Sequence, residues 1–224
     1  MKFVVAISIC FLTILGTTAS PIPVNVDIKN EQAHVNTPLG QFHVNNIKQA
    51  AVTAQSGMHE SARVAHFPEN PENHAILVEV FKKDFMIFID TIRKNVETIR
   101  DGKLVIADIN SAKTDLAATS PKTNEVHIGP KFHSLGRTDD QRARTLIHEA
   151  SHALAGTKDY FAKSDGKPIS KKEAKRVPHI CGYLANDFDK LESCQSVWNA
   201  DSYTKLASLA VEQYKKHGGK PPTK

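Results

Sequence analysis

Two stretches of the chain repeat apolar residues every three or four positions, the spacing of an amphipathic helix. The first covers residues 44–56, and we expect its helix to end near Gly57. The second covers residues 78–99 and stops before Asp101 and Gly102. Its central residues, 85–89, are apolar almost all round, so we predict that they form the most buried segment of the protein. Packing in the core explains such a run better than a cofactor site does.

Two shorter runs of β-branched and apolar residues predict strands. Residues 104–106 read Leu-Val-Ile, and residues 126–128 read Val-His-Ile. The second run alternates apolar and polar positions, as a half-buried strand does, and Gly129 follows it. Residues 111–123, between the two runs, are polar or small, and we expect a connection there.

A third helical pattern has clear signals at both of its ends. Thr138 and Gln141 form a capping box, which predicts that the helix begins at Asp139. Gly156 provides a left-handed C-cap at its other end. The positions expected to pack against the core are Ala143, Leu146, Ile147, Ala150 and Leu154.

This third helix contains the sequence His-Glu-x-x-His. The spacing of His148 and His152 puts both imidazoles on one face, one turn apart, so that two nitrogen atoms can bind one metal ion. Glu149 lies one step around the helix, where a carboxylate can reach a metal-bound water as the general base of a metalloprotease. The motif therefore predicts a catalytic zinc site.

The chain after this helix contains weaker signals. Ser170 begins a second capping box, and Pro178 ends or kinks the helix that it starts. Residues 181–191 favour a further short helix, and residues 199–214 predict the last one, with Tyr203 on its apolar face.

The length and composition indicate one domain, and the first twenty residues indicate that it is secreted. The 224 residues are 40% hydrophobic, enough for one core. Residues 1–20 have the pattern of a cleaved secretory signal, and residues 21–41 read as an extended lead-in or a short pro-segment. The single domain then spans residues 42–216, and residues 217–224 form a flexible tail.

The cysteines predict a disulfide, and the charge and hydrophobicity bear on which molecules the protein binds. Removal of the leader removes Cys10, and we expect Cys181 and Cys194 to form a disulfide in an oxidising compartment. The formal net charge of +5 comes without a basic patch interleaved with aromatic residues, so no nucleic-acid partner is expected. No apolar run beyond the leader approaches the length of a membrane span. We expect a monomer.

The third metal ligand decides which kind of zinc site this is, because a catalytic site usually has three protein ligands and a water. The pattern that continues with a glycine and a third histidine is excluded, since Lys158 stands at the last position. Glu173 and His179 are candidates, although Glu173 already belongs to a capping box. Asp159 is the best candidate, because Gly156 lets the chain reverse and a carboxylate suits zinc beside two imidazoles.

The motif and its continuation, Gly-Thr-x-Asp at residues 156–159, resemble the aspzincins, the deuterolysin and peptidyl-Lys metalloendopeptidase family of secreted, largely fungal zinc proteases. Residues 126–132 and 199–203 are also similar to segments of that family. The resemblance implies that His148, His152 and Asp159 bind Zn²⁺ and that Glu149 is the general acid and base. It also implies an α+β, mostly helical, zincin-like fold, with a small antiparallel sheet whose edge strand borders the active-site helix.

The chain departs from the family pattern at two positions. The family often has a tyrosine three residues after the ligand aspartate, where this chain has Ala162, and a cysteine where it has Gly129. A tyrosine hydroxyl would stabilise the oxyanion of the transition state, and loss of such a donor costs on the order of a hundredfold in rate. Tyr160 or Tyr203 is the candidate replacement.

The leading hypothesis is a secreted, extracellular zinc endopeptidase that acts on proteins or peptides. Glu149 moves the proton, and the strand at residues 126–128 holds the substrate extended along its free edge. The alternative is a secreted zinc-binding effector or binding protein with a protease-like fold and weak or no catalysis, which Ala162 motivates. Asp201 matches an acid that would face a basic substrate residue in the lysine-preferring relatives, but an acid in the first turn of a helix favours a structural role.

Overall fold

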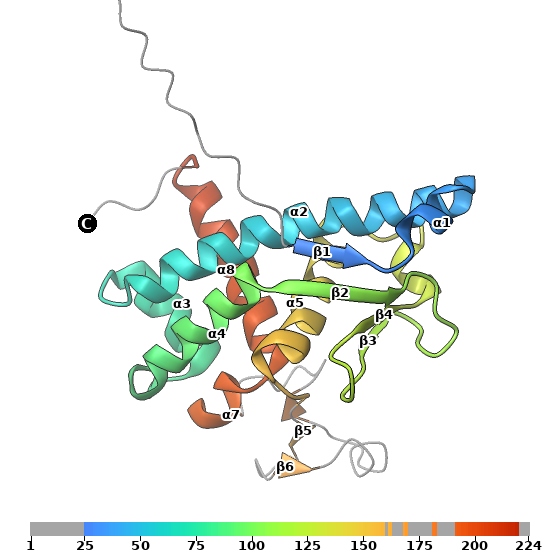
Figure 1. The fold of residues 1–224 in the computed structure, drawn as a ribbon. Helices are drawn as coiled ribbons and strands as arrows, with labels where there is room; N and C mark the ends of the chain where they lie inside the picture. The colour runs from blue at the N-terminus through green and yellow to red at the C-terminus, as the bar shows by residue number, and fades with distance from the viewer. Residues whose placement is uncertain (1–24, 160, 163–167, 170–180, 183–190, 220–224) are drawn as a thin grey trace, which may run out of the picture.

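A long helix, α2 (Pro38–His66), packs against three others, α4 (Ile89–Asp101), α5 (Asp139–Ala155) and α8 (Ala200–Lys216) (Figure 1). The structure is a computed structural model that describes residues 25–159, 161–162, 168–169, 181–182 and 191–219. These four helices and a four-stranded sheet contribute to one hydrophobic core. The described part is α+β and mostly helical, as the sequence predicts.

Helix α2 extends beyond both ends of the helix predicted at residues 44–56. It begins at Pro38, and the Thr37 side chain accepts a hydrogen bond from the Gly40 N–H at 3.0 Å. Gly57 lies inside the helix, where a Cβ atom would stand 3.2 Å from the Cβ of Ala207. The glycine therefore lets α8 approach α2 closely, and the prediction that it ends the helix is wrong.

The main sheet has the order β1 (Asn25–Ile28), β2 (Lys103–Asp108), β4 (Val126–Ile128) and β3 (Ala117–Thr119). Strands β1, β2 and β4 run parallel, and β3 runs antiparallel to β4. The sheet is therefore mixed, not antiparallel as the sequence analysis expected. Strand β1 and the short helix α1 (Glu31–Val35) lie in the stretch predicted as an extended lead-in.

The edge strand beside α5 is β3, not the strand at residues 126–128. Strand β4 lies between β2 and β3, so both of its edges are paired. Strand β3 falls in the stretch predicted as a polar connection, because its three residues, Ala-Ala-Thr, show no apolar alternation. It forms because β4 provides a partner, with Ala118 opposite His127.

The helix predicted at residues 78–99 is interrupted. It divides into α3 (Pro71–Phe81), the short 3₁₀ helix η1 (Phe85–Phe88) and α4. The break follows Lys82, whose φ of 70° is incompatible with a continuing right-handed helix. Phe85 is fully buried, but Met86 and Ile87 are 51% and 78% exposed, so this is not the most buried segment.

The remaining described elements are short. The 3₁₀ helix η2 (Pro130–His133) precedes α5, and α7 (Ser193–Val197) precedes α8. A second sheet has the order β6-β5-β7, with strands at Pro168–Ile169, Phe161–Ala162 and Cys181–Gly182.

Several predictions fall on residues that the structure does not describe. These are the leader at residues 1–20, the capping box at Ser170, Pro178, the alternative metal ligands Glu173 and His179, and all but Cys181, Gly182 and Leu191 of the helix predicted at residues 181–191. Cys181 and Gly182 form strand β7. Cys194 is exposed and has no disulfide partner among the described side chains. The side chain of Cys181 lies outside them, so the disulfide stays a prediction.

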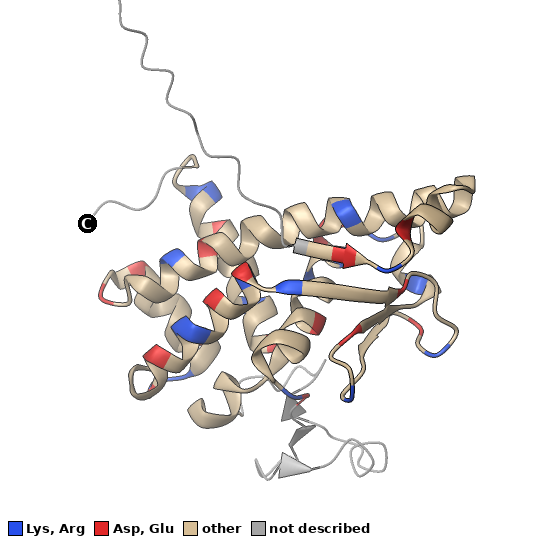
Figure 2. Ribbon diagram, viewed as in Figure 1, with Lys and Arg blue, Asp and Glu red and all other residues tan. Residues whose placement is uncertain are grey.

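Charged residues of both signs are interspersed along the helices in the view of Figure 2. No helix within the described ranges combines the length and apolar character needed to cross a membrane.

Candidate metal centre

Helix α5 carries the His-Glu-x-x-His motif, and both of its predicted caps are confirmed. The Thr138 hydroxyl accepts a hydrogen bond from the Gln141 N–H at 3.2 Å, and the Gln141 side-chain oxygen accepts one from the Thr138 N–H at 3.0 Å. At the other end, Gly156 adopts a φ of 68°. The motif residues are thus held in regular helix, whose apolar side packs against α2 and α8.

The three predicted metal ligands, His148, His152 and Asp159, come together. The Nε2 atoms of the two histidines are 3.1 Å apart. Oδ1 of Asp159 lies 3.1 Å from Nε2 of His152 and 3.2 Å from Nε2 of His148. In a tetrahedral zinc site with bonds of about 2.0–2.1 Å, two ligand atoms stand about 3.3 Å apart. The triangle has the size of one face of such a tetrahedron, so this group can hold a metal ion.

The oxygen atom beside Nδ1 of each histidine determines which ring nitrogen carries the proton. Nδ1 of His148 lies 2.9 Å from a carboxylate oxygen of Asp201, and Nδ1 of His152 lies 2.9 Å from the main-chain oxygen of Thr157. Both oxygens only accept hydrogen bonds, so when a metal ion holds the ring in its neutral form the remaining proton lies on Nδ1. Each Nε2 then presents a lone pair to the centre of the triangle, which is the protonation state that metal binding requires.

The electrostatics of the triangle favour a positive charge at its centre. Burial lowers the pKa of His148, but hydrogen bonds with Asp159 and Asp201 outweigh it and raise this pKa to about 10. Burial likewise opposes the hydrogen bonds of Asp159 with the two histidines, which hold the pKa of Asp159 well below its usual range. A divalent cation supplies the same charge that these shifts favour.

Asp159 reaches the histidines because the chain turns back directly after α5. The Lys158 N–H donates to the main-chain oxygen of Trp198 at 2.8 Å, and the Lys158 oxygen accepts from the Ala200 N–H at 3.1 Å. These two bonds form a short parallel bridge that fastens the loop to the start of α8. The loop and α8 therefore bring Asp159 and Asp201 to the same imidazole.

Glu149 is buried beside the triangle and is held by the edge strand. The Thr119 hydroxyl lies 2.7 Å from Oε2 of Glu149 and 3.1 Å from its main-chain oxygen. A hydroxyl that donates to one carboxylate oxygen leaves Oε1 as the freer oxygen. The predicted general base is thus oriented by a strand that the sequence did not indicate.

Two cavities adjoin the centre, one on each side of it along β3. The first, of about 450 Å³, is lined by β3 and the residues that follow it, by His152 and by the loop that carries Asp159. The second, of about 340 Å³, is lined by the start of β3, by the first half of α5 and by α8. His148 and Glu149 line both cavities, so a molecule that extends from one to the other passes the centre.

The predicted catalytic tyrosines have different outcomes. Tyr203 is fully buried; its hydroxyl donates to the main-chain oxygen of Val197 at 2.7 Å and accepts from the Asn95 side chain at 2.7 Å. Burial raises its pKa. A hydroxyl enclosed in this way packs the core and cannot reach a substrate, so we no longer assign Tyr203 to catalysis. Tyr160 lies outside the described residues, as does the side chain of Ala162.

Two residues of the site are not predicted as such from the sequence. Asp201 occupies the first turn of a helix, as predicted, but its carboxylate also binds His148. Thr119 lies in the stretch predicted as a connection. The motif at residues 199–203 was a signal for Asp201, whereas no pattern in the sequence marked Thr119.

The likeness to the aspzincins rests on short motifs. Compared with protein-family models and with curated proteins, the chain gives no match. Membership of that family therefore stays a prediction. Of its implied residues, His148, His152 and Asp159 lie together, with Glu149 beside them.

Proposed function

We propose that this protein is a zinc-dependent endopeptidase that hydrolyses extracellular proteins or peptides. The observation that carries the proposal is the triangle of two Nε2 atoms and one carboxylate oxygen, with sides of 3.1 to 3.2 Å and a buried glutamate beside it. Two imidazoles and one carboxylate are a ligand set of catalytic zinc, which keeps its fourth position open for water or substrate. The resemblance to the aspzincins and the leader sequence agree with this proposal.

Glu149 is the residue that moves the proton. When bound, zinc supplies a Lewis acid that polarises a peptide carbonyl and lowers the pKa of water. The Glu149 carboxylate accepts a proton from the attacking water and passes it to the leaving amine. The hydrogen bond from Thr119 to Oε2 holds this carboxylate and leaves Oε1 to accept the proton.

The free edge of β3 holds the substrate. The main-chain oxygen of Leu116 accepts from Gly129, and the Ser120 N–H donates to Glu125, so these two residues of the β3 segment face β4. Because pairs alternate in an antiparallel ladder, the backbone groups of Ala117 and Thr119 face the open edge. The Ala117 oxygen is taken by the Thr114 hydroxyl, which leaves its N–H and both groups of Thr119 for an added peptide strand.

The test measures zinc and cleavage in the same protein samples. We expect the purified protein to contain about one equivalent of zinc and to cut unstructured protein substrates. Glu149→Gln should keep the zinc and lose activity by about a thousandfold or more, because the proton acceptor is gone. Glu69→Gln, an exposed change of the same chemistry, is the matched control. Full cleavage by the Glu149 variant, or a protein that binds no zinc, would contradict the mechanism.

A zinc-binding effector or binding protein with weak or no catalysis is the second candidate. It is favoured by the burial of Tyr203, which removes one of the two candidate replacements for the tyrosine missing at Ala162. If this candidate holds, the protein binds zinc but leaves a broad peptide library uncut, and Ala162→Tyr produces measurable cleavage. A wild-type protein that turns over rapidly excludes it.

A further inference from the structure

The cavity at the start of β3, called the arginine cavity below, contains cationic groups without acidic partners among the described residues. It extends from His148 and Glu149 to Arg137, Thr145 and Arg144. Neither arginine forms an ion pair with any carboxylate of the described residues. The cavity also contains the carboxylates of Glu149 and Asp201, but these already bind Thr119 and His148.

Arg137 is the better-placed of the two cations. Its Nη2 donates to the main-chain oxygen of Gln141 at 3.1 Å and to the hydroxyl of Thr145 at 3.2 Å, which fixes the guanidinium against α5. Its Nε is buried and has no hydrogen-bond partner within the described part of the chain. Burial, and then the nearby guanidinium of Arg142, lowers the pKa of Arg137. Both observations mark a site that an anion would stabilise.

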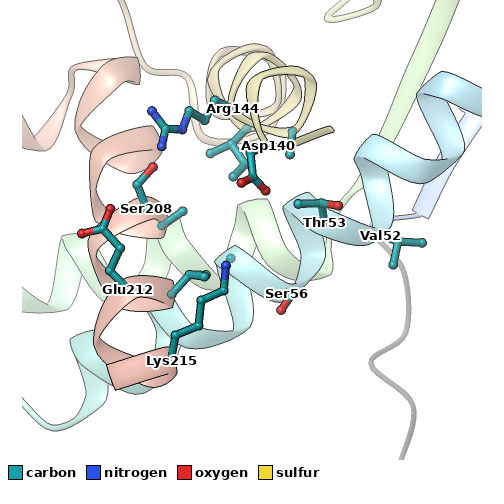
Figure 3. A pocket seen from close by; sticks show the side chains of 13 residues that line it. Val52, Thr53, Ser56, Asp140, Arg144, Ser208, Glu212 and Lys215 are labelled. Carbon is teal, nitrogen blue, oxygen red and sulfur yellow. The ribbon is translucent and has the colours of Figure 1, made fainter. Parts of the chain in front are cut away.

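A neighbouring cavity provides a comparison for the charged residues of the arginine cavity. It lies between α2, α5 and α8, has a volume of about 370 Å³, and shares Arg144 with the first. Figure 3 shows that Arg144 and Lys215 line it together with Asp140 and Glu212. Both cavities contain two basic and two acidic residues, but beside the metal centre Asp201 is bound to His148 and Glu149 is the proposed proton acceptor, which leaves the two arginines for a ligand.

The direction of β3 indicates which part of a substrate reaches Arg137. A peptide that pairs antiparallel with β3 runs from the Thr119 end of the strand to the Leu116 end. Its amino-terminal part then lies by the cavity that Asp159 borders, and its carboxyl-terminal part by the arginine cavity. The side chains that follow the scissile bond therefore lie on the Arg137 side of the centre.

We propose that the arginine cavity is the subsite for P1′, the first residue after the scissile bond, and that it selects an acidic residue, aspartate or glutamate. This inference rests on the proposed peptidase function and names the substrate class of that same site. The carboxylate pairs with the guanidinium of Arg137, which lines the cavity, while Arg144 adds a second positive charge. A basic P1′ residue is disfavoured, because Asp201, the acid expected to receive it, is held by His148.

The experiment compares peptides that differ only at P1′, with Glu, Gln, Lys or Leu there. For the wild-type protein, we expect kcat/KM to be at least about tenfold higher with Glu than with Gln, and lowest with Lys. Arg137→Gln should abolish the preference for Glu over Gln, and Arg144→Gln should reduce it. Lys215→Gln, which removes a cation from the neighbouring cavity, should leave the preference unchanged. Arg137→Lys, which keeps the charge, should retain part of it.

A binding measurement separates this inference from the peptidase function. Zinc-loaded Glu149→Gln protein is titrated with fluorescently labelled Glu and Gln peptides, and the Glu peptide should bind about tenfold more tightly unless Arg137 is also changed to Gln. If the wild-type protein cuts nothing but this difference appears, the subsite stands and the peptidase proposal fails. If cleavage occurs with equal rates for Glu and Gln, or with a preference for Lys, the subsite proposal is overturned. It is equally overturned if Arg137→Gln, with native circular dichroism and zinc content, keeps the preference for Glu.

Discussion

The metal centre and the arginine cavity share His148 and Glu149, but their polar groups are engaged very differently. In the centre, each imidazole meets its neighbours through Nε2 and an oxygen acceptor through Nδ1. In the cavity, Arg137 has one nitrogen with two partners and a buried Nε with none. Groups held from several sides are preorganised for chemistry, whereas open donors acquire a partner only when a ligand arrives. Under the proposed function, the first part carries the reaction and the second selects the substrate.

The largest expected effect is the loss of zinc affinity when one of the three metal ligands is removed. We expect His152→Ala to weaken zinc binding by about a thousandfold or more, because two of three protein ligands cannot hold the ion tightly. Zinc affinity is measured by competition with a chromogenic chelator. The exposed change His59→Ala is the control, and a variant that binds zinc as the wild type does would remove His152 from the centre.

The next largest effect is expected at Asp201. Replacement by Asn leaves the helix in place but weakens the acceptor for Nδ1 of His148, and zinc affinity should fall about 10- to 100-fold. Asp90→Asn is the matched control, since Asp90 is also an acid in the first turn of its helix. Equal effects of the two substitutions on zinc affinity would reduce Asp201 to a helix-capping role.

A smaller effect is expected at Thr119. Thr119→Val removes the hydrogen bond to Oε2 of Glu149 without changing the shape of the side chain, so kcat/KM should fall about tenfold while zinc content stays the same. Thr53→Val, a similar change on α2, should leave kcat/KM unchanged. Zinc loss in Thr119→Val would mean that the strand supports the ligands and not the base.

The smallest effect on the centre is expected from Arg137→Gln. No hydrogen bond joins Arg137 to the three ligands, so zinc affinity should stay within about twofold of the wild type. This measurement sharpens the division between the two parts. A large loss of zinc would show that the arginine cavity and the metal centre are one coupled structure.

The part of the site that the sequence predicted is the part defined by local spacing. The caps of α5, the shared face of its two histidines and the turn at Gly156 all depend on residues within a few positions of one another. Asp159 follows seven residues after His152 and could be reached by the same reasoning. Short-range rules of helix geometry were therefore enough for the ligands.

The residues that the sequence missed act across long separations. Thr119 is 30 positions from Glu149, and Asp201 is 53 positions from His148. Strand β3 exists only because β4 pairs with it, and a period of three or four residues in 78–99 did not indicate the reversal at Lys82. Tyr203 is a further example. A tyrosine on an apolar helix face gives the same sequence pattern whether its hydroxyl binds Asn95 in the core or contacts a substrate. Tertiary partners decide these features, and spacing along the chain does not encode them.

Because of the bridge between Lys158 and the start of α8, the position of Asp159 does not depend on the length of the chain between residues 159 and 200. The chain leaves the site at Asp159 and is fastened beside it again at Ala200, so the two ends of the stretch between them are already held together. Closing a longer loop between fixed ends costs little additional free energy, about 0.6 kcal/mol for each doubling of its length. A change in the length of this stretch can therefore leave the three predicted ligands and the Asp201 carboxylate in place.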